Sequence, residues 1–221
     1  PMTARAATAA LLTLAVAFPS LAAELKYADQ GAHWTPAERK EFYSLDQGPR
    51  IMPFDRFKPL KRSDGSHFLD DGMVRYGYLR NPDSAAGLPV GFLVAPDSNT
   101  LSMTCAACHT RQIDVGDVSL RVDGGPAIVD IQQLFSDLDT SVDAVVNDAP
   151  TFAEFAKQVL GPHATEQERK LLHKQVADWF KPYHVPMKES LPPKGWGVGR
   201  PDAVSMISNR LSGLDIGTGP D

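Results

Sequence analysis

Cysteine is scarce in this chain, with two residues of that type in 221. They are Cys105 and Cys108, and a bridge between them would close almost no loop, whereas a structural disulfide stabilises mainly by restricting a long one. A fold held together by disulfides is therefore excluded. A structural zinc site is not favoured either, because two cysteines and one adjacent histidine fall short of four ligands and the sequence offers no second cluster.

Long hydrophobic runs are also missing. The apolar run over residues 6–18 is shorter than the about 20 residues that a bilayer-spanning helix needs. It follows Arg5 and precedes Ser20-Leu21-Ala22, which predicts a secretory signal peptide over residues 1–23, cut after Ala22 or Ala23. We expect a periplasmic or secreted protein with no membrane span after cleavage; an uncleaved membrane anchor is the alternative.

The chain has no excess of positive charge. Its net charge is −5, which gives no reason to expect nucleic acid or an anionic membrane as a partner. The 18 prolines and 17 glycines follow no period, so repeats are excluded and many irregular connections are expected. About 200 mature residues of ordinary composition are enough to bury a globular core.

The chemistry of the chain centres on one motif, Cys105-Ala106-Ala107-Cys108-His109. In a c-type cytochrome two thiols at this spacing form thioethers with the porphyrin, and the next histidine binds the iron. The motif predicts one covalent haem c, attached by Cys105 and Cys108 with His109 as the iron ligand. A thioredoxin-like dithiol is the alternative, but it needs a strand ahead of the motif, and the sequence gives no convincing one.

The iron's second axial ligand is the open question, because methionine is absent between Met103 and Met187. Met187 lies in the proline-rich stretch "YHVPMKESLPPKGWG", which is expected to be a surface connection. An open or weakly occupied distal site is the leading hypothesis, and a six-coordinate electron carrier is the alternative. The histidines that compete with Met187 as ligands are His33, His67, His163, His173 and His184. Each also has a structural interpretation, His173 as a partly buried helix residue and His67 and His184 as loop residues.

Local signals predict a mainly α fold, a cytochrome c-like haem domain over residues 24–221 with extra loops and a small β-hairpin. Thr35 and Thr165 each begin a capping box ahead of a helix, and the first of these helices is expected to stop at Gly48. Apolar residues from Ile128 to Val142 recur at helical spacing, "TFAEFAKQVL" predicts another helix, and "LPVGFLVA" an extended segment. Gly116-Asp117 predicts the hairpin turn.

A string of further segments carries a family resemblance: "DQGPRIMPFDRF", "YGYL", "LPVGF", "TCAACHTRQI", "RVDGGPAIVDIQQLF" and "GWGVGRPDAV". Between about Asp46 and Ile207 the chain resembles the N-terminal haem half of the di-haem c-type cytochromes that include the bacterial rubber oxygenases. These are relatives of the di-haem cytochrome c peroxidases.

The resemblance implies two haems, the N-terminal one with an open distal face for dioxygen or peroxide and the other with two axial ligands. This chain has one CxxCH, so we expect an N-terminal fragment of a longer di-haem oxidoreductase, with a redox partner or a second haem domain supplying electrons. A reduced single-haem relative is the other reading.

The resemblance also places particular residues near the haem. Trp196 and Arg200 are implied to come close to it, where an arginine can pair with a propionate and an indole can pack on the ring. The alternative interpretation of this segment is a glycine-rich turn with a packed tryptophan. Arg121, Asp123, Gly124 and Gly125 match a tight turn near the porphyrin edge, for which a structural role is the simpler interpretation.

Overall fold

The computed structural model describes residues 23–190 and 195–199, with side chains up to His184 and again from Gly195 to Gly199. The predicted signal peptide, apart from Ala23, the Met187 side chain and Arg200 therefore lie outside the described residues. In that part no helix is long and apolar enough to cross a bilayer.

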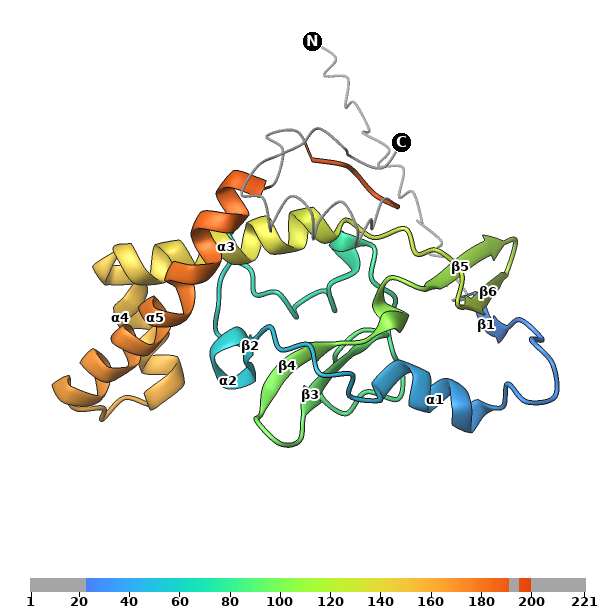
Figure 1. The fold of residues 1–221 in the computed structure, drawn as a ribbon, viewed down its shortest axis with the longest axis horizontal. Coiled ribbons are helices and arrows are strands. Elements are labelled where there is room, and N and C mark those ends of the chain that lie inside the picture. The colour runs from blue at the N-terminus through green and yellow to red at the C-terminus, as the bar shows by residue number, and fades with distance from the viewer. Residues whose placement is uncertain (1–22, 191–194, 200–221) are drawn as a thin grey trace, which may run out of the picture.

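The fold is mixed, and the expectation of a mainly α fold is wrong. Two three-stranded sheets lie below and beside a layer of helices (Figure 1). One has the order β1-β6-β5 and the other β2-β4-β3. The strands are β1 Glu24–Tyr27, β2 Met52–Pro53, β3 Phe92–Ala95, β4 Thr100–Met103, β5 Thr110–Val115 and β6 Val118–Asp123. The α-helices are α1 Pro36–Ser44, α2 Phe54–Phe57, α3 Ile131–Asn147, α4 Ala149–Leu160 and α5 Glu166–Ser190, and the 3₁₀ turns are η1 Val74–Tyr76 and η2 Cys105–Ala107.

Long-range pairing explains why β1 and β2 escape a sequence-based prediction. β1 pairs in parallel with β6, from Glu24 opposite Val118 to Tyr27 opposite Arg121. β2 has two residues and exists through its antiparallel pairing with β4. Segments this short carry no periodic signal of their own, so their partners decide their structure. The hairpin of β5 and β6 turns at Gly116, where φ is +62°, as predicted.

The helix starts agree with the predicted capping boxes. The Thr35 and Glu38 side chains each accept from the other's backbone N–H at the start of α1. Thr165 and Glu168 do the same ahead of α5. Helix α1 ends at Ser44 and not at Gly48. Helix α5 continues through the proline-rich stretch to Ser190, so the loop expected around His184 is wrong.

Helices α3, α4 and α5 pack against one another and against the β2-β4-β3 sheet. Leu138 and Val142 of α3 are fully buried, as are Phe155 of α4 and Val176 of α5. This apolar core includes Ala107, while Cys108 packs against it from the edge. The core therefore extends from the three helices to the back of the CxxCH motif.

Two glycines allow backbone segments to touch near the motif. A Cβ on Gly91, where φ is +78°, would lie 2.1 Å from the Ala107 amide nitrogen. A Cβ on Gly77, where φ is +82°, would lie 1.9 Å from the Ile128 carbonyl oxygen. Both contacts are with backbone, which cannot rotate away, so only glycine fits.

We expect Gly91→Ala to lower the free energy of unfolding by about 3 kcal/mol, because it combines a backbone clash with a strained positive φ. Thermal and denaturant unfolding measure the change. Gly195→Ala is the matched control, because Gly195 has no positive φ and an added Cβ meets nothing closer than 3.9 Å. Equal stability of the two variants would contradict the close packing described here.

Candidate functional site

The CxxCH motif forms a single tight turn between β4 and β5. Thr104 caps the turn, its hydroxyl accepting from the Ala106 N–H at 3.2 Å. The Cys105 carbonyl then accepts from the N–H groups of Cys108 and His109, at 3.2 and 2.9 Å. These bonds bring Cys105, Cys108 and His109 onto one turn of backbone.

The turn is fixed by hydrogen bonds to three separate segments. Thr104 donates its N–H to the Gly91 carbonyl at 2.7 Å, and the Cys105 N–H donates to the Gln47 side chain at 3.0 Å. The Cys108 carbonyl accepts from the Ala127 N–H at 3.0 Å, and the His109 carbonyl from the Gly124 N–H at 2.7 Å. The backbone of the motif is therefore held in place on both sides.

The side chains of the motif differ in exposure. Cys105 and His109 are exposed, Cys108 is half-buried, and both thiols are free. Ala106 and Ala107 are buried behind them. The hollow on that buried side has about 160 Å³ of empty space, far less than a porphyrin needs. A group that joins both sulfurs has to approach from the accessible side of the turn.

Burial raises the pKa of the Cys108 thiol to about 11, and the neighbouring Cys105 adds to the shift. A reactive dithiol needs one accessible thiol with a lowered pKa, and Cys108 is not that thiol. A strand, β4, does precede the motif, contrary to expectation. It belongs to an antiparallel sheet and leads into a 3₁₀ turn, not into the βαβ unit of a thioredoxin-like site.

The "GWGVG" segment lies alongside the residues that hold the motif. The Gly199 N–H donates to the Val129 carbonyl at 3.0 Å, and the Trp196 N–H to the Gln132 side chain at 2.9 Å. Trp196 is thus bonded to the start of α3, which follows the Ala127 that bonds Cys108. That Trp196 comes close to a haem stays a prediction. Arg200 lies outside the described residues.

Three buried donors near the motif have no hydrogen-bond partner within the described part of the chain: Trp196 Nε1, Tyr78 Oη and Thr110 Oγ1. Tyr78 is close enough to Cys108 for a Cys108 charge to raise the pKa of its hydroxyl, although burial is the larger cause. A buried donor without an acceptor costs about 1–3 kcal/mol. Thr110 directly follows the motif and Tyr78 is close to Cys108, so an acceptor at the turn would reduce this cost.

Asp123 and Gly124, two of the residues matched to a tight turn, have structural roles beside the motif. Asp123 is 3% exposed and accepts from Trp34 Nε1 at 2.8 Å, Arg39 Nε at 2.8 Å and the Tyr43 hydroxyl at 2.5 Å. The donors come from 80 to 89 residues earlier, so no local signal could have identified them. Gly124 has a φ of +79°, as a tight turn requires.

Three histidines have side-chain partners away from the motif. His173 Nε2 contacts the Val146 carbonyl at 2.9 Å, which agrees with its structural interpretation. His184 Nδ1 lies 2.9 Å from both carboxylate oxygens of Asp139. His67 Nδ1 is 3.5 Å from Asp70. His33 and His163 are exposed.

No group of three or more histidine, cysteine, aspartate and glutamate side chains within residues 23–184 and 195–199 is arranged to hold a metal ion. This finding concerns ions bound by protein ligands alone. A c-type haem brings four nitrogen ligands of its own and takes a single histidine from CxxCH.

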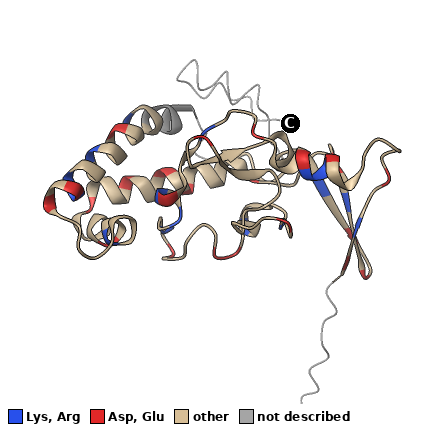
Figure 2. Cartoon of the chain, turned by 90° about the horizontal axis from the view of Figure 1, so that it is seen from below, with Lys and Arg blue, Asp and Glu red and all other residues tan. Residues whose placement is uncertain are grey.

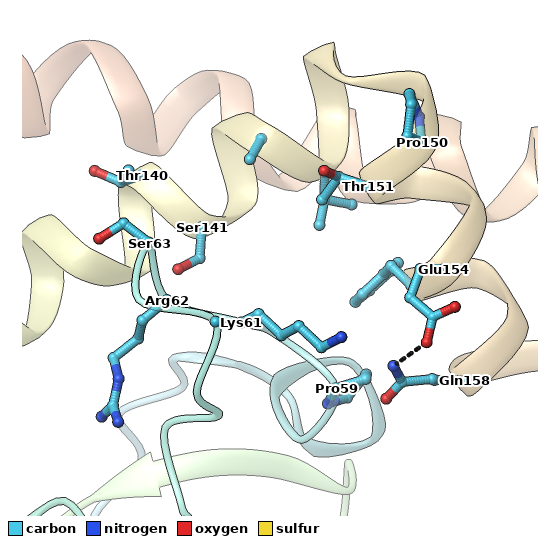
Figure 3. Close-up of a pocket in the computed structure, with 14 residues that line it drawn as sticks. Pro59, Lys61, Arg62, Ser63, Thr140, Ser141, Pro150, Thr151, Glu154 and Gln158 are labelled. Atoms are coloured by element: carbon cyan, nitrogen blue, oxygen red, sulfur yellow. Dashed lines mark hydrogen bonds between the residues drawn. The ribbon is translucent and has the colours of Figure 1, made fainter.

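A larger cavity, of about 490 Å³, lies away from the motif between the loop at residues 59–65 and helices α3 and α4. Lys61 extends across it toward Glu154 and Gln158, while Arg62 points out of it (Figure 3). Glu154 accepts from the Gln158 amide at 2.9 Å. The cavity shares no residue with the CxxCH turn.

Charge on the surface is mixed in sign. Acidic and basic residues follow one another along α5 (Figure 2), with the ion pairs Lys170–Glu166 and Lys174–Asp178. Exposed pairs of this kind contribute little to stability.

Comparison with known proteins gives one similar sequence. Over 215 residues the chain is 31% identical to "Uncharacterized protein y4iJ" of Sinorhizobium fredii, an alignment that covers 83% of this chain and 36% of that protein. The chain thus spans about a third of the length of this relative, whose name describes no activity. No family model matches the chain. No solved structure matches it.

The two thiols should differ in reactivity in the reduced, haem-free chain. Cys105 is exposed and should be alkylated rapidly at neutral pH, whereas Cys108 stays protonated until the pH approaches about 11. Below that pH its thiolate fraction rises about tenfold per unit. Alkylation with iodoacetamide across pH, followed by mass spectrometry in the Cys105→Ser and Cys108→Ser variants, measures both rates. Rapid alkylation of Cys108 at pH 7 would contradict its burial.

Proposed function

We propose that this chain is a c-type cytochrome domain that holds one haem c covalently through Cys105 and Cys108, with His109 as the proximal iron ligand. The observation that carries the proposal is the CxxCH turn itself. Its backbone is fixed by hydrogen bonds to three segments, while Cys105 and His109 remain exposed. A rigid turn with accessible thiol and imidazole groups suits covalent attachment and iron ligation.

The unpartnered donors near the turn fit the same group. A haem carries two carboxylates, and carboxylates are strong acceptors for buried N–H and O–H groups. Trp196 Nε1 is the donor placed by the segment that the family resemblance singled out. The residues present therefore fit a haem, with Trp196 as a candidate contact.

The protein's own groups would define how such a haem works. When bound, the haem supplies an iron that exchanges electrons and, at an open position, binds dioxygen or peroxide. The hydrogen bond from Gly124 fixes the His109 carbonyl, which limits how far the imidazole can move. The partners of His67, His173 and His184 hold these histidines elsewhere, which favours an open distal face.

On this basis the leading function is redox chemistry as the N-terminal haem region of a di-haem oxygenase or peroxidase-like oxidoreductase. The family assignment rests on the sequence resemblance, and a second haem domain or redox partner would exchange electrons with this one. A periplasmic or secreted location is part of the same proposal, since haem c attachment takes place outside the cytoplasm. The first strand, β1, begins at Glu24, directly after the predicted cleavage site.

The alternative is a single-haem electron carrier with a six-coordinate iron. Met187 remains its candidate ligand and lies on α5. A thiol oxidoreductase is disfavoured by the setting of the motif, in which an antiparallel sheet leads into a 3₁₀ turn and not into a βαβ unit.

Covalent attachment is tested directly by mass spectrometry of the exported protein. We expect an added haem mass that survives denaturation, and loss of one thioether in Cys105→Ser or Cys108→Ser. Thr110→Ser, which keeps both cysteines, is the control and should retain the full haem mass. Wild-type protein that is exported in a strain competent for cytochrome c maturation, yet carries no haem, would refute the proposal.

Carbon monoxide distinguishes the two haem functions. An open distal face predicts a ferrous haem whose absorption spectrum changes on adding carbon monoxide, equally in wild type and in Met187→Ala. The six-coordinate alternative predicts a low-spin wild type that becomes high-spin in Met187→Ala. A low-spin spectrum that is indifferent to carbon monoxide would exclude the oxygenase or peroxidase function.

A further inference from the structure

A second cavity, of about 420 Å³, lies beside the inner face of the β1-β6-β5 sheet and is lined by two arginines. Arg121 of β6 and Arg80 contribute the positive charge, and Gln112 and Ser119 add polar groups. No acidic residue lines it. Leu25, Pro82 and Pro89 form an apolar part of the wall.

Arg121 is buried, with 3% of its surface exposed. Burial is unusual for a charged residue. One of its terminal nitrogens, Nη2, donates to the Gln112 side-chain oxygen at 3.0 Å. Its Nε and Nη1 have no hydrogen-bond partner among the residues that the structure describes. A buried charge without a counter-charge is strongly unfavourable, so burial of Arg121 calls for an anion.

The carboxylates closest to this region serve other groups. Asp123, two residues along β6, already accepts hydrogen bonds from Arg39, Trp34 and Tyr43. Asp114 is exposed and accepts from Ser119 and from the Gln112 amide, which orients the Gln112 oxygen toward Arg121. Within residues 23–184 and 195–199, neither Arg121 nor Arg80 forms an ion pair.

Arg80 is placed at the exposed rim of the cavity by a close contact. A Cβ on Gly72 would lie 3.2 Å from Arg80 Nη1, so the absence of a side chain there gives the guanidinium its place against the backbone. The cavity thus has one buried cation at its base and one exposed cation at its mouth.

We propose that this cavity binds a carboxylate, with Arg121 as its buried cation and Arg80 as the cation at its rim. A carboxylate matches a planar guanidinium in charge and shape. The apolar wall suits a short hydrocarbon body better than a fully hydrated phosphate. Two sources share this chemistry: a free small organic acid, and a carboxylate of a haem attached at the neighbouring CxxCH turn.

The test uses the holoprotein and acetate as the probe, against sodium chloride at equal ionic strength. A ligand that binds only the folded state raises the melting temperature, and the stabilisation grows with the logarithm of its concentration once that exceeds Kd. We expect acetate to stabilise wild type, and Arg80→Gln and Arg121→Gln to weaken acetate binding by at least about tenfold, the effect of losing one charge-assisted hydrogen bond.

Arg111→Gln is the matched control. It removes the same charge from the same hairpin, but Arg111 lies on β5 next to Gln112 and therefore on the opposite face of the sheet. It should bind acetate as wild type does. An equal loss in Arg111→Gln overturns the proposal. So does the absence of any acetate stabilisation beyond that of sodium chloride in wild type, together with no change in haem potential in any variant.

The two sources give different results. If a free acid is the ligand, acetate binds the holoprotein. If the haem's own carboxylate occupies the cavity, acetate binds only the haem-free chain, and Arg80→Gln and Arg121→Gln shift the haem reduction potential while Arg111→Gln does not. The acetate experiment on the haem-free chain remains decisive if haem attachment itself fails, so the two proposals stand or fall separately. Arg80 is exposed, so its variant keeps the test valid if Arg121→Gln does not fold.

Discussion

The buried carboxylate of Asp123 is the interaction on which the neighbourhood of the CxxCH turn depends. It gathers donors from Trp34, Arg39 and Tyr43, and so ties the N-terminal segment to β6. Tyr43 packs in turn against Ala106, between the two cysteines. Removing one partner of such a buried pair costs about 3–5 kcal/mol, because a charge is left without compensation. The same side chain therefore stabilises the fold and fixes the wall behind the motif.

The β1-β6-β5 sheet inverts the usual distribution of polar and apolar residues. On β6, Ser119, Arg121 and Asp123 are buried, whereas on β5 Ile113 and Val115 are 44% and 69% exposed. The inner face of this sheet is thus a polar layer, and the apolar core lies with the helices and the other sheet. Both the Asp123 network and the arginine-lined cavity belong to that polar layer, which explains why they lie close together and close to His109.

Prediction from sequence succeeded where the signal is local. The capping boxes at Thr35 and Thr165 and the hairpin turn at Gly116 depend on residues a few positions apart, and each was found. The fold class was wrong because β1 and β2 exist through pairing with distant segments, and because β4, which forms a hairpin with β3, was not predicted. The helix around His184 was missed because its two prolines suggest a loop, while contacts with α3, such as that of His184 with Asp139, favour the helix.

The sequence by itself determined the chemistry of the candidate site. The spacing of Cys105, Cys108 and His109 is fixed by covalent neighbours, so it can be recognised without a structure. The tertiary structure alone decided which of these side chains is exposed, which donors lack an acceptor, and that Arg121 is a buried cation beside a cavity. Burial and electrostatic compensation arise from contacts between residues far apart in the chain, and only the folded arrangement brings those residues together.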